Sequence, residues 1–248
     1  SELLKGPANT GVTVTVKRGE DTLQFSLNRK KISLKNVPFY GKLDEQTGYI
    51  KLSDFTTNAS AEVRNALVSL KAQGATQLVL DLRDNPGGLI NEAVEIVNLF
   101  VPKGKEVVKT IGKLQQVNYT YKTNKTPVDT KIGIIVLIND RSASAAEIVA
   151  GALQDYDRAV LLGQKSFGKG LVQTTLPLSF NAQIKVTTAK YYIPSGRCIQ
   201  AIDYAKSRED GSAGTVPDSL RKAFKTANGR VVLDGAGIEP DEKVTEKS

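Results

Sequence analysis

From residue 38 to residue 163 the sequence repeats one pattern, in which a short apolar run is followed by a segment with helical spacing. The apolar runs cover residues 49–52, 77–82, 132–138 and 159–162. The first helical segment has apolar residues at the i, i+3, i+4, i+7 spacing of one helix face and ends at Gly74; two more follow residues 88 and 143. Strands that alternate with helices form a largely parallel sheet. The sequence therefore predicts an α/β fold, with functional sites where strand carboxyl ends meet helix amino termini.

The two ends of the chain follow other patterns. Residues 12–16 and 23–27 alternate apolar and polar side chains around a turn at 18–21, which predicts a β-hairpin. Because about thirty residues of this kind cannot bury a core alone, we expect residues 1–36 to be the tail of a small truncated module. After residue 171 the sequence predicts strands over 184–188 and 190–193. A polar, irregular stretch over 203–230 follows, with a short helix at 219–226.

The chain has no histidine and a single cysteine, Cys198. These absences exclude Ser-His-Asp triads, Cys-His proteases, zinc sites built on histidine or paired cysteines, and an intrachain disulfide. If the protein performs nucleophilic catalysis, its general base is therefore a lysine, a carboxylate or an amino terminus.

The net charge of +8 and the pI of about 9.4 raise the question of nucleic-acid binding. The densest basic cluster, residues 29–31, has no aromatic side chains between its charges. A solvated basic surface therefore fits the sequence better than a nucleic-acid partner. The apolar run at 134–138 is far too short to cross a membrane.

Three segments that follow predicted strands carry residues with chemical potential. The glycines of Asn85-Pro86-Gly87-Gly88 fit either a tight turn or a loop that donates backbone N–H groups to an oxyanion. Ser144 begins a predicted helix, where it is either a nucleophile or the N-cap of a capping box with Glu147; taken alone, the cap is the better interpretation.

The third segment places Lys169 between Gly168 and Gly170, with Gln173 four residues further on. A lysine carried inward on a close-packed turn is desolvated and can act as a base. The alternative, a surface charge, is the commoner case for a single lysine. The segment does not match the phosphate-loop spacing, since residue 170 is Gly rather than Ser or Thr.

The order and spacing of the three segments resemble those of the C-terminal processing peptidases, also called tail-specific proteases. The matching stretches are residues 80–88, 142–148 and 167–173, and the resemblance runs from about residue 38 to residue 241. It implies a crotonase-like (ClpP/crotonase-type) α/β core of repeated strand–helix units with additional β-strands, preceded by a PDZ domain. Residues 1–36 would be the C-terminal part of that PDZ domain. Residues 37–248 would be the catalytic domain, with 203–230 as an insertion.

The same resemblance assigns roles to residues that match the family motifs. Ser144 would be the nucleophile, Lys169 the base, and Gln173 the residue that orients Lys169. The backbone N–H groups of Gly88 and Ala145 would form the oxyanion hole, with Gly87 as the substitute for the first donor. Two nearby residues, Ser142 and Asp155, would have no catalytic role, and Ala146 stands where the family often has serine.

The implied activity is that of a serine endopeptidase that forms an acyl-enzyme with a Ser–Lys dyad and needs neither metal nor cofactor. Its partners would be proteins with non-polar, poorly structured C-termini. The parent protein would be extracytoplasmic and membrane-associated, and a homo-oligomer is allowed. Three alternatives stay open: a non-catalytic peptide-binding scaffold of the same fold, a crotonase-type acyl-CoA enzyme, and a resting arrangement in which Lys169 is held away from Ser144.

Overall fold

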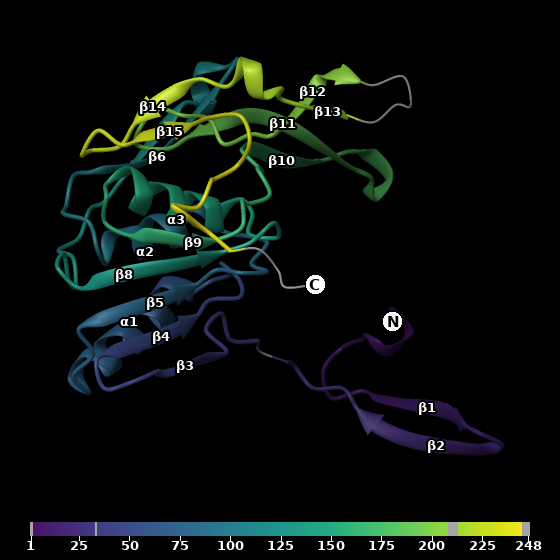
Figure 1. Cartoon of the computed structure of the whole chain (residues 1–248). Coiled ribbons are helices and arrows are strands. Elements are labelled where there is room, and N and C mark those ends of the chain that lie inside the picture. Colours follow the sequence, from purple (N-terminus) through teal and green to yellow (C-terminus); the bar gives the residue numbers. More distant parts are fainter. Residues whose placement is uncertain (1, 33, 208–212, 245–248) are drawn as a thin grey trace. The chain divides into compact units, whose positions relative to one another are not determined.

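A computed structural model describes residues 2–32, 34–207 and 213–244 (Figure 1). The chain divides into two compact units, Ser1–Lys35 and Asn36–Ser248. Within the described ranges, none of the helices is both long enough and apolar enough to span a membrane.

The first unit is a β-hairpin preceded by a single 3-10 turn, η1 (Glu2–Leu4). β1 (Gly11–Arg18) pairs antiparallel with β2 (Asp21–Asn28), which confirms the predicted hairpin. Gly19, in the two-residue turn, has a φ of 65°, as such a turn requires. The guanidinium of Arg29 donates to backbone carbonyls of η1 and of β1 and so joins the two ends of the unit.

The second unit is built on a six-stranded sheet of order β16-β9-β8-β5-β4-β3. All neighbouring strands are parallel except β3 and β4, which confirms the predicted parallel sheet. In chain order the strands are β3 (Phe39–Lys42), β4 (Thr47–Lys51), β5 (Gln77–Asp81), β8 (Gly133–Ile138), β9 (Val160–Gly163) and β16 (Glu242–Lys243).

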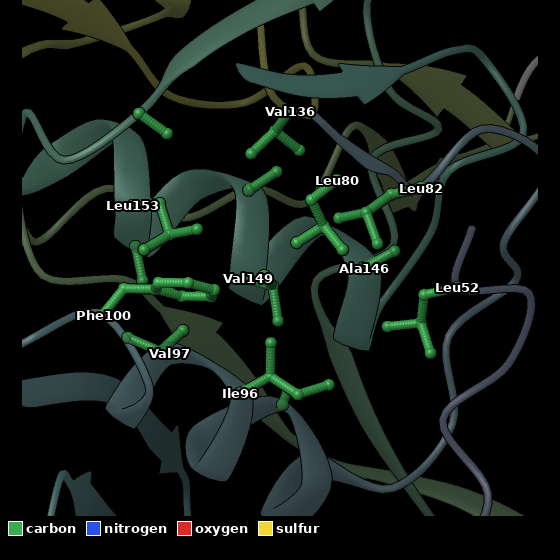
Figure 2. Packing of buried hydrophobic residues seen from close by; sticks show 14 of the residues in the cluster. Leu52, Leu80, Leu82, Ile96, Val97, Phe100, Val136, Ala146, Val149 and Leu153 are labelled. Atoms are coloured by element: carbon green, nitrogen blue, oxygen red, sulfur yellow. The ribbon is translucent and has the colours of Figure 1, made fainter. Parts of the chain in front are cut away.

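Three helices supply the rest of the core, and all three were predicted: α1 (Ala59–Ala72), α2 (Ile90–Asn98) and α3 (Ala145–Asp155). Figure 2 shows Leu80 and Val136 of the sheet in one cluster with Ile96 of α2 and Val149 of α3. Each of these side chains is fully buried and contributes about 1.5–3 kcal/mol to stability. All eleven residues of α3 are buried, so this helix is fixed in the core around its whole circumference.

A second, antiparallel sheet of order β10-β11-β6-β7 accounts for the additional strands expected beside the core. β10 and β11 form a long hairpin, joined through η3 (Ser179–Asn181), that extends outward from the core (Figure 1). The strands expected at 184–188 and 190–193 are one continuous strand, β11. The bounds are β6 (Glu106–Gly112), β7 (Tyr119–Lys122), β10 (Leu171–Pro177) and β11 (Gln183–Tyr192), with η2 (Gln115–Val117) between β6 and β7.

The expectation for residues 203–230 is wrong in part, since this stretch contains regular structure. Its elements are β12 (Ile202–Ser207), β13 (Ala213–Thr215), η4 (Asp218–Leu220) and β14 (Ala223–Lys225), and β15 (Val231–Leu233) follows. The helix predicted at 219–226 is wrong because Phe224 pairs with Val232 in the β14–β15 hairpin. Pairing with a distant strand outweighs a weak local helix preference. Residues 208–212 lie outside the described ranges.

Candidate active site

The turn that carries Ser144 lies between the end of β8 and the first turn of α3. Ser144 has a φ of 56° and a ψ of −114°, a backbone conformation that residues with side chains rarely adopt. Strain of this kind persists where the surrounding contacts enforce it. Ser142, two residues earlier, is fully buried, and its hydroxyl donates to the Leu82 carbonyl at 2.8 Å. Ser142 therefore fixes the turn to the end of β5.

The buried carboxylate of Glu147 joins the Ser144 turn to the Lys169 loop. Its Oε2 accepts the backbone N–H groups of Ser144 and of Lys169, each at 2.8 Å. Its Oε1 accepts the Ser166 hydroxyl at 2.6 Å and the Gly168 N–H at 2.7 Å. Because one oxygen binds both nitrogens, the backbone nitrogens of Ser144 and Lys169 are at most twice the bond distance apart.

Glu147 thus does more than the capping box predicted from its spacing to Ser144. The box is present, but the same carboxylate also accepts donors from a loop about twenty residues further along the chain. Burial raises the pKa of Glu147, and its four hydrogen bonds lower it in part.

The glycine loop lies against the Ser144 turn. The Ala143 N–H donates to the Asn85 carbonyl at 2.9 Å. A Cβ on Gly87 would lie 2.8 Å from the Ser144 Cβ, and one on Gly88 would lie 2.4 Å from the Phe55 carbonyl oxygen. Their φ angles of 99° and 145° also favour glycine. Both positions therefore need glycine for close approach as well as for backbone conformation.

The two candidate oxyanion donors on this loop, the N–H groups of Gly87 and Gly88, differ in their hydrogen bonding. The Gly87 N–H donates to the side chain of Asn85 at 2.8 Å and is already satisfied. The Phe55 N–H donates to the Gly87 carbonyl, and the Phe55 carbonyl accepts the Leu89 N–H. Because successive N–H groups point in alternate directions in extended backbone, the N–H of Gly88 points away from Phe55. Within the part of the chain that the structure describes, neither the Gly88 N–H nor the Ala145 N–H has a protein acceptor.

Lys169 follows β9 in a loop held by backbone contacts. Gly168 and Gly170 are buried: the Ala201 N–H donates to Gly168, and the Gly170 N–H donates to the Gln200 side chain at 2.7 Å. The Lys169 residue itself is exposed. The expectation of an inward, desolvated lysine side chain is therefore wrong in this structure, because only the backbone of the loop packs inward.

The structure does not bring the side chains of the predicted dyad into contact. Among the hydrogen bonds of the described residues, none joins the Lys169 ammonium to Ser144 or to Gln173. Gln173 is exposed on β10, and it lines a cavity of about 230 Å³ together with Lys169.

Tyr191 is the neighbour of Ser144 that the sequence did not reveal. It lies on β11, nine-tenths buried, and its N–H donates to the Gly170 carbonyl at 2.8 Å. Burial raises the pKa of Tyr191, while hydrogen bonding with the Ser144 side chain lowers it in part. The phenol is therefore protonated at neutral pH. No local motif marks this tyrosine, because its place at the site comes from the pairing of β10 with β11.

The buried carboxylate of Asp155 lies at the other end of α3. It pairs with the guanidinium of Arg197 at 2.9 Å, and both side chains are 1% exposed. It also accepts the Ser195 N–H at 2.9 Å. Asp155 therefore ties the C-terminal end of α3 to the segment after β11. In the described part of the chain, no cluster of three or more His, Cys, Asp or Glu side chains has the geometry of a metal site.

Comparisons with known proteins identify a family and several similar proteins. The model of peptidase family S41 matches residues 46–210. A probable CtpA-like serine protease of Staphylococcus aureus (strain MSSA476) is 34% identical, over 98% of this chain and 51% of the relative. A carboxy-terminal-processing protease of Bartonella bacilliformis is 41% identical, over 80% of this chain and 46% of the relative. The chain thus spans about half the length of these relatives.

Among solved structures, the photosystem II D1 C-terminal processing protease is similar with a TM-score of 0.65 and 28% identity. The match covers 98% of this chain and 58% of that protein.

Proposed function

The chain belongs to peptidase family S41, and we propose that it acts as a serine endopeptidase with Ser144 as nucleophile and Lys169 as general base. The observation that carries the proposal is the single carboxylate oxygen of Glu147 that binds both backbone nitrogens. It fixes the spacing of the two backbones and leaves the lysine side chain free. A lysine has a flexible four-carbon stem, so rotation of that side chain can bring its nitrogen to the Ser144 hydroxyl.

In the proposed reaction neutral Lys169 takes the proton from the Ser144 hydroxyl, and the oxygen attacks the scissile carbonyl carbon. The N–H groups of Gly88 and Ala145 hold the oxyanion; the lack of an acceptor for either group among the residues that the structure describes supports this role. The protonated lysine then gives its proton to the leaving amine. A water molecule, activated by the same lysine, hydrolyses the acyl-enzyme.

Gln173 is the proposed orienting residue for Lys169. Both side chains line the same cavity, which supports the assignment. Tyr191 is a protonated neighbour of Ser144 and takes no proton in this scheme.

The wider biology is proposed from the family resemblance and from the names of the relatives. Substrates would be proteins with non-polar, poorly structured C-termini. The second unit would be a crotonase-like catalytic domain, and residues 1–36 would be the last part of a PDZ domain that captures those C-termini. The whole protein would be extracytoplasmic and membrane-associated.

Intact-mass analysis after treatment with a fluorophosphonate tests the dyad. We expect one adduct on the wild-type protein, none on Ser144→Ala, and none on Lys169→Ala within the labelling time that is just sufficient for the wild type. Lys165→Ala, on the same loop and also exposed, is the matched control and keeps the adduct. A folded wild-type protein without an adduct would reject the peptidase proposal and favour the peptide-binding scaffold of the same fold.

A further inference from the structure

The β10–β11 hairpin has one apolar face that is exposed. Leu176 stands opposite Ile184 in the pairing register, and Val186 follows Ile184 by two residues on the same strand. Opposite residues, and residues two apart, share a face of a β-ribbon. Leu178 continues the extended backbone of β10, with a φ of −119° and a ψ of 175°, and therefore lies on the same face. All four side chains are exposed, although an apolar face of this kind is ordinarily buried against a second layer.

The opposite face of the hairpin is largely polar. Thr175 pairs with Lys185, and Pro177 pairs with Gln183. Residues 171–192 contain no Asp or Glu, and their two charges are Lys185 and Lys190. The hairpin is therefore an amphipathic ribbon with a wholly positive charge.

Phe180 stands at the tip of this ribbon, in η3. Its φ of 59° and ψ of 37° lie in the left-handed region, which glycine and asparagine adopt most readily. A tight turn ordinarily takes a small or polar residue at such a position, but here a phenylalanine is fully exposed. Because the hairpin extends outward from the core (Figure 1), its tip presents this ring ahead of the rest of the domain.

The size and charge of this surface favour a lipid bilayer over a protein partner. A stable protein interface takes about 20–30 residues from each side, whereas the ribbon offers four aliphatic side chains and one ring. An element with an apolar face and a basic polar face lies at the boundary between lipid headgroups and acyl chains. Lysine stems reach from there to the headgroups, and the absence of carboxylates over residues 171–192 means that no side chain of the ribbon is repelled by anionic lipids.

We propose that the β10–β11 hairpin docks on an anionic lipid bilayer, with Phe180 and the aliphatic face in the apolar boundary and Lys185 at the lipid phosphates. This inference does not depend on the proposed peptidase function. β10 has seven residues and rises about 3.4 Å per residue. Docking therefore holds the Lys169 loop within about 25 Å of the membrane-bound tip.

A single tryptophan at the tip tests insertion directly. The chain contains no tryptophan, so Phe180→Trp in the full chain gives an emission that comes from one site. With vesicles of phosphatidylcholine and about one-third phosphatidylglycerol, we expect this emission to shift to shorter wavelength and to be quenched by brominated acyl chains. Phe39→Trp is the matched control, because Phe39 is also an exposed phenylalanine but lies on β3, and its emission should not change.

Two results would overturn the proposal. One is an emission from Phe180→Trp that vesicles neither shift nor quench. The other is a shift that grows with protein concentration when no vesicles are present, which would identify a second copy of the chain as the occupant of the apolar face.

Sedimentation with the same vesicles separates the apolar and the electrostatic contributions. The double variant Leu178→Ser, Phe180→Ser should bind at least about tenfold more weakly than wild type, and Phe39→Ser should bind as wild type does. Lys185→Gln should weaken binding about fivefold on the anionic vesicles and leave binding to pure phosphatidylcholine unchanged. These side chains are exposed, so the midpoint of urea unfolding should stay the same and confirm that each variant is folded. Equal binding by wild type and the double variant would reject the hairpin as the docking element.

Discussion

The two halves of the candidate site are held in different ways. Ser144 stands at the start of a helix in which every residue is buried, and its neighbours on the glycine loop fit only because Gly87 and Gly88 have no side chain. Lys169 stands in the loop that leads into β10, a strand that is half-buried for two residues and exposed beyond. The proposed nucleophile and the proposed oxyanion donors are therefore fixed by the core, while the proposed base is fixed only through its backbone.

This difference indicates which part of the candidate site can move. Movement of Ser144 would disturb the central core, whereas rotation of the Lys169 side chain disturbs no packed contact. Assembly of the dyad would then require rotation of one side chain on a preformed frame, and Glu147 is the part that both halves share.

The largest effect is expected from Glu147→Ala, which removes the link between the halves. Four donors on Ser144, Ser166, Gly168 and Lys169 lose their acceptor. A buried donor left without its acceptor costs about 1–3 kcal/mol, so we expect the free energy of unfolding, measured by urea titration, to fall by about 4 kcal/mol. Glu92→Ala is the control: that partly buried carboxylate accepts two backbone N–H groups and should cost about 1 kcal/mol. Equal losses would show that Glu147 is only a helix cap.

Lys169→Ala should separate activity from stability. Loss of a general base slows a reaction about 10²–10⁴-fold, so the rate of fluorophosphonate labelling should fall by about 10³. Because the residue is exposed, the free energy of unfolding should change by no more than about 0.5 kcal/mol. A stability loss above about 1.5 kcal/mol would contradict the comparison, since it would place the lysine side chain in the packed half of the site.

Asp81, at the end of β5, sharpens the comparison through pH. Its buried carboxylate accepts the Tyr49 hydroxyl at 2.6 Å and the Arg83 guanidinium at 2.7 Å. Burial raises the pKa of Asp81, but the hydrogen bonds from Arg83 and Tyr49 lower it by more. The net pKa therefore lies below the ordinary value of 3.8. A carboxyl group whose pKa is lowered in the folded state stabilises the fold at pH values above its ordinary pKa. That stabilisation is lost as the pH falls through the ordinary pKa and then through the lowered pKa.

Asp81→Asn should therefore lose about 2 kcal/mol at pH 7, as expected for hydrogen bonds to a charged group. The difference from wild type should shrink as the pH falls below about 4, measured by urea titration across the range. Asp84→Asn is the control on the same loop; its side chain is 54% exposed, and the change should be a few tenths of a kcal/mol. If the difference in unfolding free energy between wild type and Asp81→Asn stayed constant with pH, the charge of Asp81 would not be what stabilises its contacts with Tyr49 and Arg83.

The sequence predicted what short-range spacing can encode. Helical spacing and apolar runs identified the three helices and the parallel strands, and the three-residue spacing of Ser144 and Glu147 identified the capping box. These signals depend on neighbours within one or two turns.

The sequence did not predict what depends on long-range pairing. The bonds from Glu147 to Gly168 and Lys169 join residues more than twenty positions apart, and Tyr191 reaches the site through the pairing of β11 with β6 and its bond to the Gly170 carbonyl. The outward direction of Lys169 likewise follows from the packing of Gly168 and Gly170 against residues 199–201, which come from a later segment of the chain. No spacing in a single sequence records such contacts.

The smallest expected effect tests whether Ser144 is strained by the packed half of the site. Ser144→Gly and Ser144→Ala both lack the hydroxyl, so their difference in unfolding free energy reports on the backbone alone. Glycine adopts a positive φ without strain, and we expect the glycine variant to be more stable in urea by about 1–2 kcal/mol. Asn58 offers the matched control, because it also precedes a helix at positive φ but with an ordinary left-handed ψ of 8°. The Gly–Ala difference there should be smaller. If the two sites gave the same difference, the conformation of Ser144 would be that of a common helix start, and the core would impose no special geometry on the proposed nucleophile.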